Sequence, residues 1–251
     1  MAIKPILFNT EMVQAILDGR KNCTRRMVKP QPDEKHTYPL GFVTDSTEKK
    51  EVGCFGFGIN EYGGSIKYAN PQYQPGDILY VRETWERFEC WNCDGDERGN
   101  CPKEPKKSVL DKTCGCYMYR ATDEISRDAK WKPSIHMPKE AARIWLKVTN
   151  VRVERLQEIT EVQTEEEGFL FTPPCLHQTG ENYCDIDGPC GNKIKYCDMS
   201  AGELFGKVLW DSTIKKSDID IYGWDANPWV WVIEFERCEK PKEVRYERNS
   251  F

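Results

Sequence analysis

The segment 144–156 constrains the fold most, because apolar and polar residues alternate along it. Ile144-Trp145-Leu146-Lys147-Val148 and Val151-Arg152-Val153-Glu154-Arg155-Leu156 show the period of two that a half-buried strand requires. Residues 3–8, 78–85 and 229–235 also have the length and the β-branched and aromatic composition of strands. Only brief helical patterns separate these runs. The sequence therefore predicts an α+β fold in which a small β-barrel carries short helices.

Polar segments interrupt this pattern in three places. Residues 30–70 are rich in Gly and Pro, which indicates loops or hairpins with little core. The segments 87–130 and 170–199 place cysteines among Gly, Asp and Lys and look inserted. We therefore predict one elaborated domain over residues 1–240, with insertions at about 30–70, 87–130 and 170–199. The charged tail 241–251 is expected to fray.

The overall charge limits the classes of partner. The chain has 36 basic and 41 acidic residues and a net charge of -5, which argues against indiscriminate coating of nucleic acid but allows a local basic patch. No apolar run approaches the roughly 20 residues that cross a bilayer, and the N-terminus lacks the apolar stretch of a secretion signal. We therefore predict a cytoplasmic protein with no membrane partner. The oligomeric state is not predicted.

Local signals place three helices. The first is expected from Thr10 to Gly19, with Thr10 as its cap. A capping box at Thr160 opens an acidic helix that runs through Glu167 and stops at Gly168. A second capping box at Ser200 opens a helix whose apolar residues share one face; these residues are Leu204, Phe205, Val208 and Leu209.

A basic loop follows the first helix, at residues 19–26. A helix C-terminus repels anions, so any attraction of this loop for phosphate must come from its own cations. These cations are Arg20, Lys21, Arg25 and Arg26. The loop suits a polyanion such as nucleic acid, or else it is a solvated surface run paired with nearby carboxylates.

Four segments taken in order carry a family resemblance. Gly19-Arg20-Lys21 with Thr24 and Arg26 matches a G-x-K-x-x-T-x-R loop. The turn and strand Gly76-Asp77-Ile78-Leu79, the helix end Glu166-Glu167-Gly168 and the closing strand Val232-Ile233-Glu234-Phe235 follow it. On these residues, over roughly half of its length, the chain resembles the ASCH family, a PUA-like β-barrel group associated with RNA. Its length and insertions are similar to those of phage- and prophage-encoded members.

The resemblance implies an activity and three catalytic residues. The motif loop is most similar to that of the bacterial N4-acetylcytidine amidohydrolases, which implies Thr24 as nucleophile, Lys21 as base and Glu167 as acid. Glu166 and Glu83 are alternative carboxylates. To act as a base at neutral pH, Lys21 needs a pKa lowered by roughly three units. The expected partner is a modified nucleoside or RNA.

Two alternatives are a non-catalytic module and a ribonuclease. In the module, Arg25 and Arg26 hold phosphates, and aromatic rings stack on the bases. The candidate rings are Trp85, Trp224, Tyr222 and Trp229, although core packing is the commoner role for such rings. In the ribonuclease, His136 is the candidate acid or base, although a lone histidine is more often structural.

The cysteines indicate structural zinc. Cys90-x-x-Cys93 has zinc-knuckle spacing, and Cys101, Cys114 and Cys116 lie near enough to complete a four-thiolate site. A looser set follows, consisting of Cys175, Cys184, Cys190 and Cys197, with His177 as a substitute ligand. Polar insertions bury little apolar surface, so we predict one or two structural zinc ions and no organic cofactor. Cys23, Cys54 and Cys238 are expected to be ordinary small residues.

Overall fold

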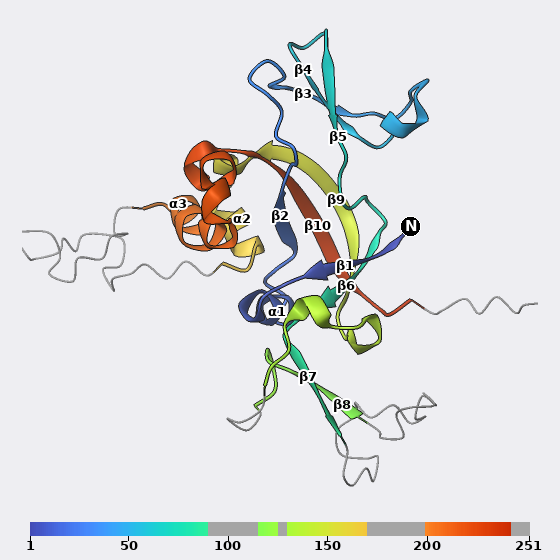
Figure 1. The fold of residues 1–251 in the computed structure, drawn as a ribbon, viewed down its shortest axis with the longest axis vertical. Coiled ribbons are helices and arrows are strands. Elements are labelled where there is room, and N and C mark those ends of the chain that lie inside the picture. The colour runs from blue at the N-terminus through green and yellow to red at the C-terminus, as the bar shows by residue number, and fades with distance from the viewer. Residues whose placement is uncertain (90–114, 125–129, 170–198, 242–251) are drawn as a thin grey trace, which may run out of the picture. The chain divides into compact units, whose positions relative to one another are not determined.

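The computed structural model describes residues 1–89, 115–124, 130–169 and 199–241. Its strands are β1 (Ile3–Leu7), β2 (Cys23–Met27), β3 (Tyr38–Phe42), β4 (Phe55–Gly58), β5 (Ile66–Ala69), β6 (Ile78–Arg82), β7 (Trp85–Glu89), β8 (Gly115–Tyr119), β9 (Trp145–Arg155) and β10 (Trp229–Cys238). Its α-helices are α1 (Thr10–Leu17), α2 (Glu161–Glu166), α3 (Ala201–Leu204), α4 (Asp211–Thr213) and α5 (Ile219–Tyr222). The mixed α+β class is therefore confirmed (Figure 1).

Short 3₁₀ segments and one π-helix complete the secondary structure. The 3₁₀ segments are η1 (Lys49–Glu51), η2 (Ser134–His136), η3 (Lys139–Ala141), η4 (Leu156–Glu158), η6 (Lys216–Asp218) and η7 (Trp224–Ala226). The π-helix is η5 (Phe205–Trp210).

The chain divides into two compact units. Unit 1 comprises Met1–Asp18, Gly76–Lys147 and Glu236–Phe251, and unit 2 comprises Gly19–Pro75 and Val148–Phe235. The long strands β9 and β10 contribute residues to both units. The prediction of one domain over 1–240 stays a prediction.

The strands form three sheets. The largest has five strands in the order β1-β6-β9-β10-β2, and β3-β4-β5 and β7-β8 form the other two. The predicted barrel is wrong as a closed structure: in the described part of the chain, the strand order runs from β1 to β2 without returning to its start. Ala2 and Phe8 make backbone bonds to β6, so the intervening Pro5 points its nitrogen away from β6 and has no N–H for a further strand.

In unit 1, β1 pairs in parallel with β6, and β6 pairs in antiparallel fashion with the first residues of β9. The side chain of Asn9, one residue before the predicted cap, accepts a hydrogen bond of 2.8 Å from the Met12 N–H and caps α1. A core cluster lies under the β7-β8 hairpin; its buried members are Ile78, Trp85, Tyr119, Met137, Ala141, Ala142 and Trp145.

In unit 2, the β3-β4-β5 sheet contradicts the prediction of little core in residues 30–70. Along β4, Phe alternates with Gly, so the two aromatic rings share one face and the glycines take the other. Phe57 is 1% exposed and its ring centroid lies 5.4 Å from that of Trp229, at a tilted angle, while the ring centroids of Phe55 and Trp231 lie 6.2 Å apart. Gly56 and Gly58 therefore belong to a strand, whereas Gly53, Gly63 and Gly64 lie in the connecting turns, as the prediction of hairpins implied.

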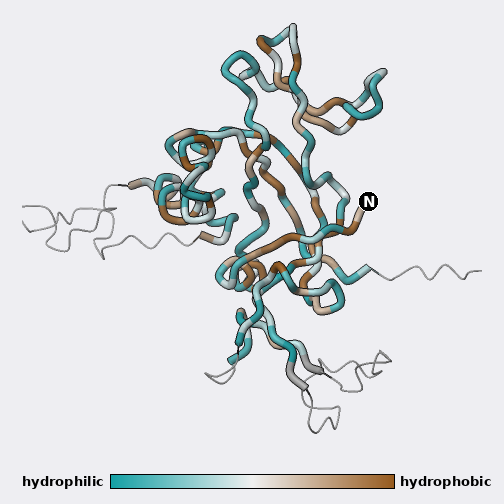
Figure 2. The backbone as a smooth tube through the Cα atoms, in the orientation of Figure 1, coloured by the Kyte–Doolittle hydropathy of each residue, from teal (hydrophilic) through white to brown (hydrophobic). Residues whose placement is uncertain are grey.

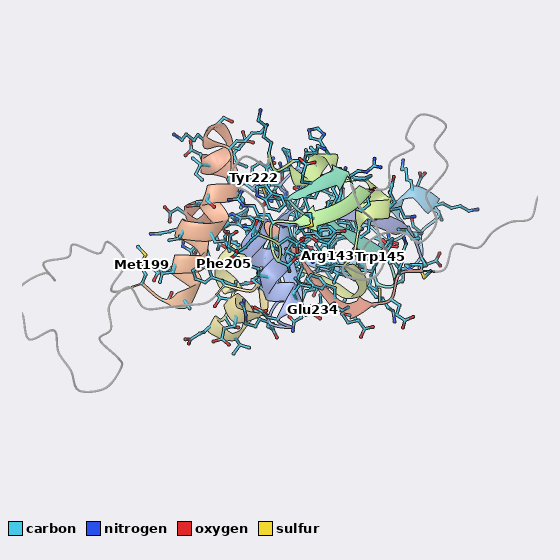
Figure 3. The ribbon with its side chains drawn as sticks, turned by 90° about the horizontal axis from the view of Figure 1, so that it is seen from below. Arg143, Trp145, Met199, Phe205, Tyr222 and Glu234 are labelled. Atoms are coloured by element: carbon cyan, nitrogen blue, oxygen red, sulfur yellow. The ribbon has the colours of Figure 1, made fainter. Side chains whose placement is uncertain are left out.

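Short helices cover a second core cluster in unit 2. Its buried residues are Leu156, Ile159, Phe205, Trp210, Ile214, Trp224, Val230 and Val232. Phe205 and Tyr222 come from these helical segments (Figure 3). The central strands of the largest sheet are coloured largely hydrophobic in Figure 2, in agreement with the buried side chains of β10.

The π-helix changes the predicted face of the helix after Ser200. The capping box of Ser200 and Glu203 is present, and Leu204 and Phe205 are buried. The i→i+5 bonding of η5 then rotates the following residues, so Val208 is 43% exposed instead of sharing that face. Gly206 is required here, because a Cβ atom at this position would lie 2.0 Å from the Trp224 ring.

Candidate functional site

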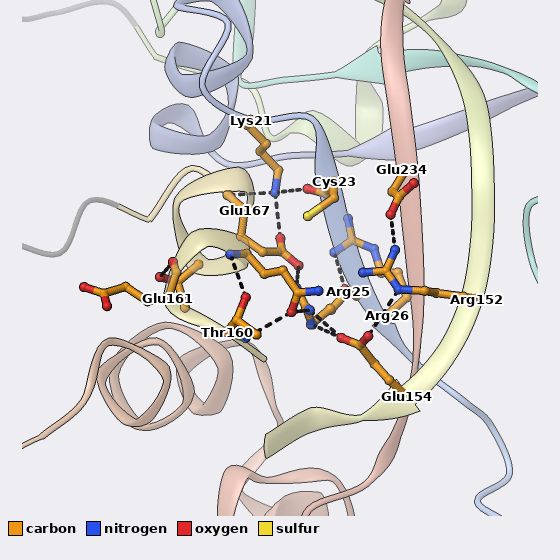
Figure 4. Close-up of polar contacts among 12 residues, drawn as sticks. Lys21, Cys23, Arg25, Arg26, Arg152, Glu154, Thr160, Glu161, Glu167 and Glu234 are labelled. Atoms are coloured by element: carbon orange, nitrogen blue, oxygen red, sulfur yellow. Dashed lines mark hydrogen bonds and ion pairs between the residues drawn. The ribbon is translucent and has the colours of Figure 1, made fainter. Parts of the chain in front are cut away.

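Lys21 lies in the loop between α1 and β2, and its side chain is fully buried in unit 2 (Figure 4). Its Nζ donates to the Cys23 carbonyl at 2.7 Å, to the Glu167 carbonyl at 2.7 Å and to Glu167 Oε2 at 2.8 Å. An ammonium group has three N–H donors, so these three acceptors match it. The structure therefore brings together two of the three predicted catalytic residues.

Glu167 reaches Lys21 because α2 ends there. Gly168 takes a φ of +82° and stops the helix, as its sequence position predicted. The terminal carbonyls of a helix lack partners within the helix, and the basic loop supplies them. The Asn22 N–H donates to the Glu166 carbonyl at 3.0 Å, and Arg20 Nη1 donates to the Gly168 carbonyl at 3.4 Å. Cations at this end also complement the helix dipole.

Thr24 lies on β2, opposite Ile233 of β10, and is 1% exposed. Its Oγ1 is buried and has no hydrogen-bond partner among the residues that the structure describes. An unpaired buried hydroxyl is costly, since folding removes its bonds to water without replacing them. Such a group marks a position where a ligand atom can supply the missing bond.

Beyond Lys21, ion pairs continue as a row of alternating charges. This six-residue charge row consists of Lys21, Glu167, Arg25, Glu154, Arg152 and Glu234, in that order. Arg25 Nη1 lies 3.4 Å from Glu167 Oε1, and Arg25 Nε lies 3.1 Å from Glu154 Oε1. The other end of Glu154 binds Arg152 Nε at 3.2 Å, and Arg152 pairs with Glu234.

The charge row runs from the interior to the surface. The side chains of Lys21, Glu167 and Arg25 are 0%, 2% and 0% exposed. Those of Arg152 and Glu234 are 32% and 39% exposed. Because three cations alternate with three anions, each buried charge has an opposite neighbour.

Burial sets the protonation behaviour of two groups at the buried end. Burial lowers the pKa of Lys21, and the Glu167 carboxylate opposes this shift. Burial, with a further contribution from Glu167, raises the pKa of Cys23 to about 12. Cys23 is therefore a neutral thiol at neutral pH and an unsuitable nucleophile.

Sequence reasoning missed Glu154, Arg152, Glu234 and Gln163. Gln163 Oε1 accepts from Arg25 Nη2 at 3.0 Å and also from the Thr160 N–H at 3.0 Å, which closes the predicted capping box. Arg152 and Glu154 stand two residues apart on β9 and so share a face. The sequence shows the spacing of Arg152 and Glu154, but it does not show that β10 lies beside β9 and brings Glu234 to Arg152.

The remaining predicted site residues have other surroundings. Arg26 Nη1 donates to the Arg25 carbonyl at 3.3 Å. Trp224 is 6% exposed within the core of unit 2. Trp85 is a core residue of unit 1, and His136 is exposed in η2 of unit 1.

Glu83, the alternative carboxylate, forms a buried pair with Arg143 in unit 1. Arg143 Nε and Nη2 each lie 2.9 Å from a Glu83 oxygen, and Arg143 Nη1 donates to Thr122 at 2.8 Å. The Arg143 guanidinium also lies 4.0 Å from the centre of the Tyr119 ring. Figure 3 labels Arg143 among the side chains of this unit. Burial raises the pKa of Glu83, and Arg143 opposes this shift.

Replacing Arg143 with Met is expected to lower the free energy of unfolding by about 2 to 3 kcal/mol at neutral pH, because a buried carboxylate loses its partner. The pKa of Glu83 then rises further above its unfolded value, so the folded state binds the extra proton and stability falls as pH rises. Urea denaturation at about pH 5 and about pH 8 measures this slope.

Lys132→Met is the control for this variant, because it breaks an exposed pair with Glu86 in the same unit and should change stability by less than about 0.5 kcal/mol. Equal stability losses for Arg143→Met at both pH values would contradict the role given to Glu83.

Cys116, one of the predicted zinc ligands, lies in β8, and the others lie outside the described residues. They are Cys90, Cys93, Cys101, Cys114, Cys175, Cys184, Cys190 and Cys197, together with the substitute ligand His177. Within residues 1–89, 115–124, 130–169 and 199–241, no group of three or more His, Cys, Asp and Glu side chains could hold a metal ion. Cys23, Cys54 and Cys238 are free thiols. Structural zinc stays a prediction.

Comparison with known proteins adds no identification. No family model matches the chain, and no curated protein or solved structure is significantly similar to it. Over the described ranges, none of the helices is both long enough and apolar enough to cross a membrane.

Proposed function

We propose that this chain is an amidohydrolase that removes the acyl group from N4 of a modified cytidine nucleoside, on a PUA-like scaffold of the ASCH type. The observation that carries the proposal is the 2.8 Å pair of Lys21 and Glu167, two residues far apart in sequence. The same unit holds the Thr24 hydroxyl, which has no hydrogen-bond partner in the described part of the chain. Amide hydrolysis needs a nucleophile, a base and a proton donor. In this proposal Thr24 is the nucleophile, Lys21 the base and Glu167 the proton donor; Lys21 and Glu167 are in contact, and the Thr24 hydroxyl is hydrogen-bonded to neither of them.

The pair reaches its working state by one internal proton transfer. The ammonium of Lys21 passes a proton to the Glu167 carboxylate 2.8 Å away, which leaves a neutral amine as base and a neutral carboxylic acid as proton donor. Burial lowers the pKa of Lys21, which favours the neutral amine, although the Glu167 carboxylate opposes this shift. Arg25 Nη1 also lies 3.4 Å from Glu167 Oε1, and Glu154 in turn accepts a hydrogen bond from Arg25.

The acyl group is then transferred to Thr24 and released by water. Lys21 takes the proton of the Thr24 hydroxyl while Oγ1 bonds to the acyl carbon, and Glu167 protonates the leaving N4 amine as the amide bond breaks. Cytidine departs and leaves an ester on Thr24. Lys21 then returns its extra proton to Glu167 and takes a proton from the attacking water, whose oxygen bonds to the acyl carbon. Glu167 gives its proton to Thr24 Oγ1 as the ester bond breaks, and the carboxylic acid leaves.

The alternative binding module has less support. It used Arg25 as a phosphate ligand, but that side chain is 0% exposed and donates to Glu154, Glu167 and Gln163. Moving it to a phosphate would break these bonds and remove the cation that pairs with both Glu167 and Glu154. Arg25 is therefore better suited to pairing with Glu167 inside the protein than to binding the phosphate of a ligand.

The proposal is tested by incubating the full chain with N4-acetylcytidine and separating the products by chromatography. We expect cytidine and acetate in equal amounts. N4-methylcytidine, which has no acyl carbonyl, should stay unchanged and is the control substrate. If no cytidine forms while an ASCH amidohydrolase is active in the same buffer, the proposal is wrong. Binding of N4-acetylcytidine without turnover, measured by equilibrium dialysis, would favour the module.

A further inference from the structure

A second cluster of nucleophile and base lies in unit 2, at one end of the β3-β4-β5 sheet. His36 Nε2 lies 3.0 Å from the Ser65 Oγ, and His36 Nδ1 lies 2.6 Å from Asp33 Oδ1. Serine, imidazole and carboxylate are thus joined in the order that activates a serine hydroxyl.

The sheet topology explains why these residues meet. Tyr38, Gly58 and Ile66 lie in one row across the three strands. Since β3 and β5 both pair with β4 in antiparallel fashion, they begin at the same end of the sheet. His36 precedes β3 by two residues and Ser65 precedes β5 by one, so both stand at that end.

For a neutral imidazole, the contact with Asp33 selects the tautomer. An ionised carboxylate only accepts, so Nδ1 carries the proton that points to Asp33 and Nε2 is left to accept from the Ser65 hydroxyl. Lys67 Nζ, 2.6 Å from Asp33 Oδ2, and then His36 hold the pKa of Asp33 well below its usual range. The carboxylate also accepts the backbone N–H of His36 at 3.0 Å, which locks the turn.

The imidazole of His36 is buried, whereas Ser65 is exposed. His36 is 7% exposed, while Ser65 lies at the surface of the β4-β5 hairpin. Gly63 and Gly64, both with positive φ, precede Ser65 and leave its hydroxyl at the hairpin tip. The apolar side chains of Ile59 and Ile66 lie beside these glycines and are 49% and 39% exposed.

We propose that Ser65 and His36 form a second hydrolytic site, which takes small carboxylic esters with an apolar acyl group, and that Asp33 is its positioning residue. Ser65 Oγ bonds to the ester carbon while its proton moves to His36 Nε2. His36 returns that proton to the departing alcohol. Water then cleaves the acyl-serine, with His36 taking the water proton and passing it to Ser65, and the carboxylic acid leaves.

The test is covalent labelling of the full chain with an alkyl fluorophosphonate. Attack by Ser65 forms a phosphonate ester and releases fluoride, and the adduct is located by mass spectrometry after trypsin digestion. The peptide 51–67 contains Ser65 as its only serine, and Thr24 falls in a different peptide. We expect the adduct on Ser65. Failure to label Ser65 in the native protein would overturn the proposal without any variant.

Variants separate catalysis from structure. His36→Gln should slow labelling at least about 100-fold, because a general base contributes that much or more. Asp33→Asn keeps an oxygen that can cap the turn, so it should slow the bonding step about tenfold or more while leaving the affinity for the probe unchanged. Ser46→Ala, which removes another hydroxyl bonded to a carboxylate, should label like the native chain. Labelling that is unaffected by His36→Gln would also overturn the proposal.

Discussion

Replacing Thr24 with valine is expected to abolish hydrolysis of N4-acetylcytidine while making the protein more stable. Valine keeps the shape and the strand preference of threonine but removes the nucleophile, so turnover should fall at least about 1000-fold. The Thr24 hydroxyl is buried without a partner among the described residues, and removing such a group should raise the free energy of unfolding by about 1 kcal/mol. Product chromatography and urea denaturation measure the two effects.

Thr24→Ser is the matched control. It keeps the hydroxyl and deletes a buried methyl group, so it should retain measurable turnover and lose about 1 kcal/mol of stability. Thr24→Val should therefore lose turnover and gain stability, whereas Thr24→Ser should keep turnover and lose stability. Turnover by Thr24→Val would remove Thr24 as nucleophile. A loss of stability in Thr24→Val would show that the hydroxyl has a structural partner.

The second large effect is expected at Glu167. Glu167→Gln should lower the free energy of unfolding by about 3 to 5 kcal/mol at neutral pH, because it leaves buried Lys21 and Arg25 without their shared anion. The glutamine has nearly the same shape, but it can turn only one acceptor oxygen toward the two cations and presents N–H donors to the other. Urea denaturation measures the loss.

The loss should shrink as pH rises. Without its counter-ion, Lys21 has a folded-state pKa still further below that of the unfolded chain. Between these two values the unfolded state binds more protons, so the free energy of unfolding increases with pH. We expect Glu167→Gln to recover part of its lost stability between about pH 7 and about pH 10.

Two further variants identify the cause of that loss. The double variant Lys21→Met with Glu167→Gln should regain part of the stability and lose the dependence on pH, because no lysine is left to titrate. Glu165→Gln on the same helix changes an exposed residue and should stay within about 0.5 kcal/mol of the native chain. If the double variant is no more stable than Glu167→Gln, the unpaired ammonium is not the cause.

Local signals in the sequence predicted the elements that local physics decides. The alternation over 144–156 predicted β9, and the capping box at Thr160 and the glycine at 168 predicted the two ends of α2. The structure shows the side-chain cap of Thr160 and a positive φ at Gly168. Each of these depends on residues within a few positions of one another. The convergence of Lys21 and Glu167 was expected only from the family resemblance.

Pairing across strands could not be read from the sequence. Arg25 and Glu154 are 129 positions apart in the sequence. They meet because Arg25 lies on β2, which pairs with β10, and Glu154 lies on β9, which is the neighbour of β10 on its other side. The register of β2 on β10 is a property of the folded sheet, and shifting it by one residue would turn Arg25 to the other face. The same holds for His36 and Ser65, which needed the β3-β4-β5 pairing to be seen together.

The six-residue charge row also restricts how this sequence can drift under selection. Losing one interior member, such as Arg25, removes the buried cation that pairs with both Glu167 and Glu154, whereas losing Glu234 leaves only a partly solvated arginine without one partner. Tolerated changes should therefore begin at the exposed end and come as compensating pairs of opposite sign. In divergent descendants of this chain we expect Arg152 and Glu234 to be replaced together, and Lys21 and Glu167 to be the last to change.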